Sequence, residues 1–177
     1  MKRVLLSLVL FLISIPGLHV LRATQEVAFQ GKPVPVTQLG PKRSGPRTSF
    51  SGSIIEDPFC VVVRDRAAWH DVWKRIYQHN PSNGPYPEPP EIDFSREMVI
   101  VAAMGQRPTS GYEIIIEGAY ERDDRLEVVV KSVITARCGL VYTMVTSPID
   151  IVRLPKIERP VVFREIEVVP DCKLERG

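Results

Sequence analysis

Patterns that catalytic and metal sites require are scarce in this sequence. The chain has three histidines, and the two that follow its N-terminal segment, His70 and His79, are nine positions apart on one predicted helix, so that they point in different directions. It contains no His-Glu-x-x-His motif, no paired Cys-x-x-Cys, no glycine-rich phosphate loop and no Gly-x-Ser-x-Gly motif. We therefore expect no catalytic residue, no metal site and no cofactor.

A surplus of one charge sign is also missing from most of the chain. The formal charge is +2, but residues 1–23 hold Lys2, Arg3 and Arg22 and no acid, so that removing them leaves −1. A nucleic-acid partner requires a basic surface. The expected partners therefore include no nucleic acid.

Residues 1–23 have the pattern of an export signal. Two basic residues precede an apolar run over residues 4–15, which a Pro-Gly pair ends. Ala23 offers a cleavage position, but Leu21 is a poor match to a small-residue site, so that an uncleaved N-terminal anchor stays open. We expect an exported protein, in the periplasm, the cell envelope or the extracellular space, which meets a membrane only through this segment if it is uncleaved.

Cysteine is sparse, with Cys60, Cys138 and Cys172 only. Export permits a disulfide, and three thiols allow three pairings with one thiol left over. The alternative is that one or all of them are buried as small apolar side chains. We expect at least one oxidised pair, and the sequence does not choose among the pairings.

The distribution of proline divides the chain. Sixteen prolines favour strands and loops over helices. Residues 80–92 contain five of them and should run as a stiff, partly exposed loop. We expect a signal peptide or anchor at 1–23, an extended Pro/Gly-rich arm with at most short strands at 24–52, a β-rich domain at 53–169 and a tail at 170–177.

One helix is predicted after Asp65, a residue type that caps helix N-termini. The following apolar residues recur at helical spacing on one face, and they are Trp69, Val72, Trp73, Ile76 and Tyr77. Both tryptophans lie on this face, so that we expect them to anchor the helix to a sheet rather than to stack on a ligand.

The remaining apolar segments predict strands. Residues 98–104 are apolar throughout and should form a central strand that is buried on both faces. Leu126, Val128 and Val130 alternate with polar positions and should face the same core. The predicted strands cover residues 54–63 (interrupted near Asp57-Pro58), 98–104, 112–119, 126–130, 140–146, 149–154 and 161–169, with a polar turn at 120–125. The expected fold is mainly β, with antiparallel sandwich-like or barrel-like sheets and one amphipathic helix packed on them.

The connection over residues 105–112 has an unusual composition. Pro108 presets φ for a tight turn, and Gly111 can supply a positive φ. In one interpretation this is an architectural turn and nothing more. In the other, Arg107 and Thr109 project from the end of a sheet as a contact surface, because exposed loops on rigid scaffolds often carry recognition.

Five segments in the right order resemble the PrcB-like family of protease-complex subunits. They are residues 64–73 (RDRAAWHDVW), 90–94 (PEIDF), the strand at 98–105, the turn at 107–112 (RPTSGY) and residues 146–152 with their Thr-x-Pro pattern. Ser110 departs from the family by replacing the first glycine of its Gly-Gly pair. Ile149 and Asp150 depart as well, because an aromatic and another polar residue are usual there.

This resemblance implies a non-catalytic accessory domain that associates with a protein partner, possibly a protease. We expect the partner-binding residues to be Arg107, Pro108, Thr109, Gly111 and Tyr112, with Arg107 and Thr109 supplying contact atoms and Pro108 and Gly111 shaping the turn. The residues expected to have a structural role are Trp69, Trp73, Asp93, Phe94, Gly105 and Pro148. A weaker likeness relates residues 107–112 to a loop of chagasin-type cysteine-protease inhibitors, and residues 159–161 to a second loop of theirs, without its tryptophan.

We therefore expect an exported binding domain that stabilises or restrains a protease or another envelope protein. Two alternatives stay open. One is an enzyme of unknown class that uses Cys138 or Ser110, although neither has an adjacent base in the sequence. The other is a structural envelope domain without a specific partner, against which a large exposed apolar surface near the turn would argue.

Overall fold

The computed structural model describes residues 31–39, 53, 55–77, 88–135 and 141–170. The elements in these ranges are β1 (Lys32–Val34), β2 (Thr37–Gln38), β3 (Phe59–Val63), α1 (Arg66–Tyr77), β4 (Glu97–Ala103), β5 (Tyr112–Glu121), β6 (Leu126–Ile134), β7 (Ile149–Pro155) and β8 (Val161–Val168). The signal or anchor segment, Cys138, Cys172 and most of the proline-rich loop lie outside the described residues.

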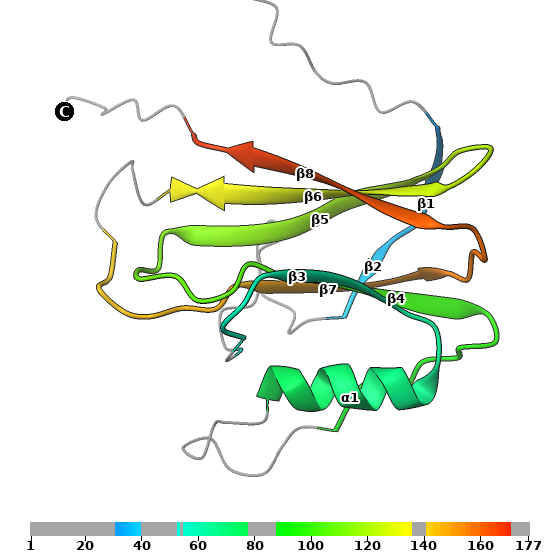
Figure 1. Ribbon diagram of the computed structural model, residues 1–177, viewed down its shortest axis with the longest axis horizontal. Coiled ribbons are helices and arrows are strands. Elements are labelled where there is room, and N and C mark those ends of the chain that lie inside the picture. Colours follow the sequence, from blue (N-terminus) through cyan, green and yellow to red (C-terminus); the bar gives the residue numbers. More distant parts are fainter. Residues whose placement is uncertain (1–30, 40–52, 54, 78–87, 136–140, 171–177) are drawn as a thin grey trace, which may run out of the picture.

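Two four-stranded sheets pack face to face, with strand orders β1-β5-β6-β8 and β2-β7-β4-β3. We call them sheet A and sheet B. Helix α1 lies along the outer face of sheet B, which gives three layers (Figure 1). The mainly β, sandwich-like fold with one packed helix is thus confirmed. The sheets of the described chain stay separate, so that the barrel-like alternative was wrong.

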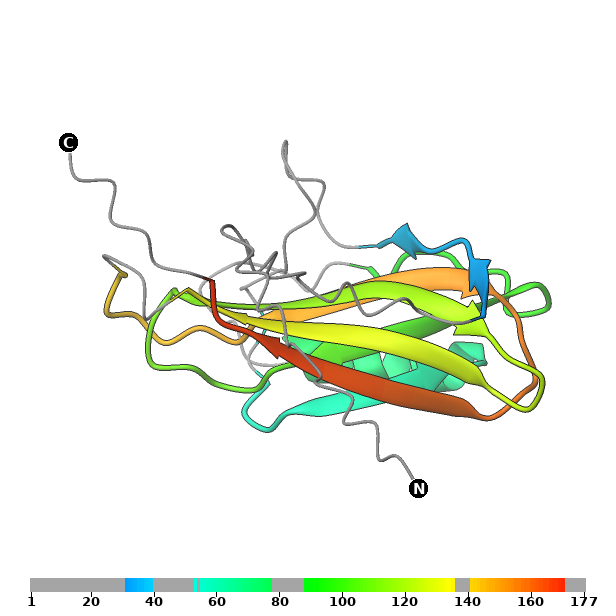
Figure 2. The same cartoon turned by 90° about the horizontal axis from the view of Figure 1, so that it is seen from above.

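Strands β6 and β8 form the one parallel pair among these strands, and the other pairs are antiparallel as expected. The reason is the path of the chain between them. After β6 the chain crosses to sheet B, runs through β7 and returns to sheet A as β8 (Figure 2). Two crossings restore the original direction, and a parallel pair needs a crossover of this kind.

Strand β4 is buried on both faces, as predicted from its continuous apolar sequence. Met98, Ile100 and Ala102 face the core between the two sheets, together with Leu126, Val128 and Val130 of β6. Val99, Val101 and Ala103 face the opposite way, into a second core under the helix. Sheet B is therefore the middle layer, and its strand β4 contributes side chains to both cores.

Helix α1 is anchored by its tryptophans, which confirms the predicted role of this face. The Ala68 N–H donates to Asp65 Oδ1 over 2.9 Å, which caps the first turn. Trp69 and Trp73 are 2% and 6% exposed. Trp69 Nε1 also donates to the Pro90 carbonyl over 3.0 Å, so that its polar atom is satisfied inside the protein.

Three sequence-based boundaries were wrong. The described part of the expected strand at 140–146 is irregular apart from one bridge between Thr146 and Arg107. The strand expected at 54–63, with an interruption near Asp57-Pro58, forms only beyond that interruption and begins at Phe59, because proline lacks a backbone donor. Tyr120 and Glu121, expected in a turn, continue β5 because β1 pairs with them.

The carboxylate of Asp150 joins the two sheets inside the core. Asp150 is 2% exposed on β7 and points between the sheets, on the same face as Val152. Its Oδ2 accepts the Ile116 N–H of sheet A over 2.8 Å. Its Oδ1 accepts the Gln38 side-chain amide and the Ile151 N–H, each over 3.0 Å. The Ile116 donor lies where the β5–β6 register shifts by one residue, so that the carboxylate satisfies a backbone group at a β-bulge.

Replacing Asp150 with Ala should lower the free energy of unfolding by about 1–3 kcal/mol, because the change leaves the buried Ile116 N–H without an acceptor and removes the bond to the Gln38 amide. Urea unfolding monitored by tryptophan fluorescence gives this value. Asp124→Ala is the matched control, since the Asp124 side chain is 71% exposed in its pair with Arg125 and its loss should cost less than about 0.5 kcal/mol. Equal effects of the two changes would contradict the structural role of Asp150.

Candidate functional site

Two connections between the sheets meet at one end of the sandwich. Residues 104–111 link β4 to β5, and residues 141–148 belong to the link from β6 to β7 (Figure 1). We call this region the crossover end. The turn that was expected at 105–112 therefore joins two sheets, and not neighbouring strands of one sheet.

Gly105 is where the chain leaves sheet B. Its φ is +75°, and a Cβ atom there would lie 2.6 Å from the Glu56 carbonyl oxygen. Only glycine meets both conditions without strain. The expected positive φ at Gly111 was wrong, because among the described glycines only Gly31 and Gly105 have one. A crossing between layers needs its sharp bend at the sheet edge, whereas Gly111 already leads into β5.

Backbone hydrogen bonds fix the two connections side by side. The Arg107 N–H donates to the Thr146 carbonyl over 2.7 Å, and the Thr146 N–H donates back over 2.9 Å. Thr146 Oγ1 donates to the Thr109 carbonyl over 2.8 Å. Further along, the Ser110 N–H donates to the Tyr142 carbonyl over 3.2 Å, and the Tyr142 N–H donates to Ser110 Oγ over 3.0 Å. The crossover end is thus a braced pair of loops.

The predicted contact residues lie together in this region, with unequal exposure. Pro108 is exposed, Gly111 is buried, and Arg107, Thr109 and Tyr112 are half-buried. The Arg107 guanidinium carbon lies 5.8 Å from the centre of the Tyr112 ring. Within the described chain, Arg107 Nε and Thr109 Oγ1 are buried without a hydrogen-bond partner. Arg107 forms no ion pair with any described residue. Its charge is therefore unpaired within the part of the chain that the structure describes.

Sequence reasoning missed the apolar surface beside this turn. Tyr142, Met144 and Val145 are 80%, 56% and 66% exposed. They were expected to be in a strand, where alternate side chains are covered. Instead their segment bonds to residues 107–110 through backbone groups and the Thr146 hydroxyl, and it leaves large apolar side chains in solvent. The signal available in the sequence was Pro148, which follows these apolar residues and cannot continue a strand.

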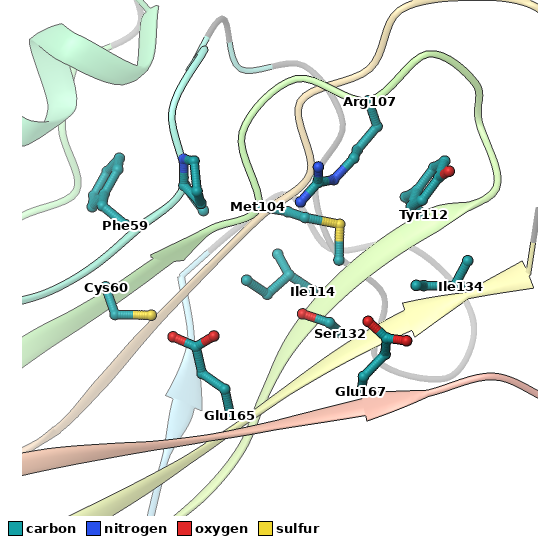
Figure 3. Close-up of a pocket in the computed structure, with 12 residues that line it drawn as sticks. Phe59, Cys60, Met104, Arg107, Tyr112, Ile114, Ser132, Ile134, Glu165 and Glu167 are labelled. Atoms are coloured by element: carbon teal, nitrogen blue, oxygen red, sulfur yellow. The ribbon is translucent and has the colours of Figure 1, made fainter.

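A cavity of about 490 Å³ opens at the same end, between the edge strands β3 and β8 (Figure 3). We call it the edge cavity. Its floor includes the apolar side chains of Met104, Ile114 and Ile134. Arg107 lines one wall, and Glu165 and Glu167 of β8 stand on the opposite side with their carboxylates turned toward it (Figure 3).

The thiol in this cavity is a poor nucleophile. Cys60 is free, and burial, together with the negative charge of Glu165, raises its pKa to about 11. A nucleophilic cysteine requires the opposite shift. Ser110 Oγ accepts the Tyr142 N–H, and no side-chain base pairs with it in the part of the chain that the structure describes. Cys138 lies outside that part.

The remaining structural residues have defined contacts. Asp93 Oδ1 accepts the Ser95 N–H over 3.1 Å and the Ser95 hydroxyl over 2.5 Å, and these bonds hold the Asp93 pKa below its usual value. Phe94 packs against the core under the helix. The Pro148 carbonyl accepts the Met104 N–H over 2.9 Å. These contacts shape the entry to β4 and the crossover end.

Other kinds of site find no support in the described ranges. No group of three or more His, Cys, Asp or Glu side chains is placed there to hold a metal ion. No helix in those ranges is both long and apolar enough to cross a bilayer. The segment at 159–161, which resembled a second inhibitor loop, precedes β8 and pairs at Val161 with Leu126. It therefore lies at the opposite end from residues 107–112, and the two do not form one surface.

Comparison with known protein families gives one finding. Residues 98–155 match the model of the family described as PrcB C-terminal. This confirms the resemblance over the segment that contains β4, both connections of the crossover end and β7. No curated protein and no solved structure matches the chain significantly.

Cys60 should react slowly with iodoacetamide at pH 8. A thiol with a pKa of about 11, in place of the ordinary 9.0, is ionised about a hundredfold less at this pH, and only the thiolate reacts. Mass spectrometry of the Cys60 peptide gives the rate, with the urea-unfolded chain as the reference. The rate should rise as pH approaches 11. A folded-state rate equal to the unfolded rate at pH 8 would contradict the protected thiol.

Proposed function

We propose that this chain is a non-catalytic protein-binding domain that engages a protease through its crossover end and stabilises or restrains it. The observation that carries the proposal is the exposed apolar surface of Tyr142, Met144 and Val145 on a braced backbone. Exposed apolar groups beside polar ones mark interaction sites when they gather in one place.

The chemistry of this surface suits a protein partner. Tyrosine, methionine and arginine are enriched in protein interfaces, and Tyr142, Met144 and Arg107 lie on the two connections that bond to each other. Because the backbone is already fixed by hydrogen bonds, binding orders fewer groups, and less of the contact energy is lost. A structural domain without a partner has no evident use for such a surface.

The family match supports the accessory role. The matched residues 98–155 include the whole crossover end as described, and a PrcB C-terminal domain suggests a subunit of a protease complex rather than the protease itself. The protonated state of Cys60 favours the same conclusion. Export is part of the proposal, and it rests on the signal-like sequence of residues 1–23.

Partner capture should depend on the apolar surface. The protein is crosslinked in its native envelope and purified, and the captured chains are identified by mass spectrometry. Changing Tyr142 and Met144 together to Ser should reduce capture of a protease at least about tenfold, the loss expected for interface hot spots. Arg107→Ala should also weaken capture, because it removes a charge that is unpaired in the described chain.

The matched control is Val162→Ser, because Val162 is 46% exposed on β8, near the opposite end of the sandwich. It should leave capture unchanged. The Tyr142/Met144 and Val162→Ser variants should keep their unfolding free energy within about 0.5 kcal/mol, as is usual for exposed positions. Undiminished capture by the Tyr142/Met144 variant would overturn the proposed contact surface, and capture of other proteins without a protease would overturn the proposed partner.

A further inference from the structure

The two long sides of the sandwich differ. On one side residues 31–39 run from β1 in sheet A to β2 in sheet B and so bridge the sheets. On the other side β3 and β8 are the outermost strands of their sheets. The edge cavity lies between these two strands and continues to Arg107 at the crossover end.

The register of β8 turns two carboxylates inward at the cavity. Val161 and Phe163 pack against the core between the sheets. Glu165 and Glu167 follow on the same face, since side chains alternate along a strand. Both carboxylates line the cavity, and neither forms an ion pair with any described residue. By contrast, Glu117 pairs with Lys131 on sheet A.

The cavity combines this charge with an apolar floor. Met104 and Ile114 are each 4% exposed at its base. Among its lining residues, two carboxylates stand against one guanidinium, and the Cys60 thiol is neutral because its pKa is about 11. Its volume of about 490 Å³ falls in the range of about 300–1,000 Å³ that is common for ligand pockets.

We propose that the edge cavity receives a lysine or arginine side chain of the protein partner. This inference rests on the proposed function and adds the chemistry of the group that is recognised. The alkyl stem of the basic side chain lies on Met104, Ile114 and Ile134, and its cationic head reaches Glu165 and Glu167. Long basic side chains bury their stems in this way while the charge stays at a polar rim.

Arg107 determines which wall of the cavity a cationic group faces. Its guanidinium lies across the apolar floor from β8 (Figure 3), so that it repels a cation from that wall and favours the wall of Glu165 and Glu167. Nε of Arg107 is buried, so that the terminal guanidinium nitrogens on this wall of the cavity donate to a carbonyl or carboxylate of the partner. A partner segment therefore meets a cation site and an acceptor-binding site at opposite walls.

A competing explanation gives the carboxylates no ligand. Charges that point inward on an edge strand prevent edge-to-edge pairing of sheets, and Glu165 and Glu167 could serve that purpose alone. The two explanations differ in one measurable respect. A receptor for a basic side chain distinguishes a lysine from an uncharged side chain of the same stem, whereas a charged edge has no site for either.

The test is a methyl NMR titration of the full chain with Nα-acetyl-lysine N-methylamide and with its norleucine analogue, which lacks the ammonium group. The lysine probe should shift the methyl signals of Met104, Ile114 and Ile134 saturably and bind at least about fivefold more tightly than norleucine. Glu165→Gln with Glu167→Gln should remove this difference. Arg107→Gln should tighten lysine binding a few-fold. Glu158→Gln, an exposed carboxylate at the other end, should change nothing.

Equal affinities for the two probes, or no saturable shift, would overturn the proposal and leave the carboxylates as edge protection. Loss of the lysine preference in Glu158→Gln would also overturn it, because the effect would then be long-range. The titration contains no partner protein. A negative titration therefore does not affect the conclusion from the capture experiment on Tyr142 and Met144. A negative capture experiment likewise does not affect the result of the titration.

Discussion

The carboxylate of Asp150 is the interaction on which the arrangement of the two sheets depends. It is 2% exposed between the sheets and accepts hydrogen bonds from β5, from the Gln38 side chain and from its own strand. A buried carboxylate without donors is very costly, so that the fold has to keep β5 and β7 in one relative position. The bulge in β5 brings the Ile116 N–H to that position. Asp150 is thus tied to the register of sheet A as well as to sheet B.

This constraint lies close to the crossover end. Asp150 is two residues beyond Pro148, whose carbonyl binds Met104, and Ile116 is four residues beyond Tyr112. The connections at 104–111 and 141–148 therefore start from strands with a fixed separation. Their mutual hydrogen bonds complete the bracing, and Tyr142, Met144 and Val145 project from it. An exposed apolar surface on a hydrogen-bonded backbone orders fewer groups when it binds a partner.

The parts of the fold that the sequence predicts are those coded locally. The apolar run at 98–104 predicted a strand covered on both faces, and the spacing of Trp69, Trp73 and Ile76 predicted the helix face, as observed. The parallel pairing of β8 with β6 and the path of residues 141–146 were not predictable in this way. Both depend on which sheet the chain enters next, and no local period encodes that choice.

The candidate site likewise contains features that the local sequence indicates and features that it does not. The residues at 107–112 attracted attention by composition, but the need for a positive φ falls on Gly105, because it passes close to the Glu56 carbonyl. Asp150 was noted only as a departure from a family pattern. Its role requires Ile116 and Gln38, which are 34 and 112 positions away. Glu165 and Glu167 alternate as on a solvated strand, and only the open side of the sandwich makes them part of a cavity.

The most direct test of the central claim is site-specific photocrosslinking in the native envelope. A benzoylphenylalanine placed at position 142 should form a covalent adduct with a protease, because Tyr142 projects from the crossover end. The same group at His70, which is exposed on α1 and lies on the outer side of sheet B, should form none. An adduct from position 70 without one from position 142 would contradict the account, since the partner would then bind the helix layer.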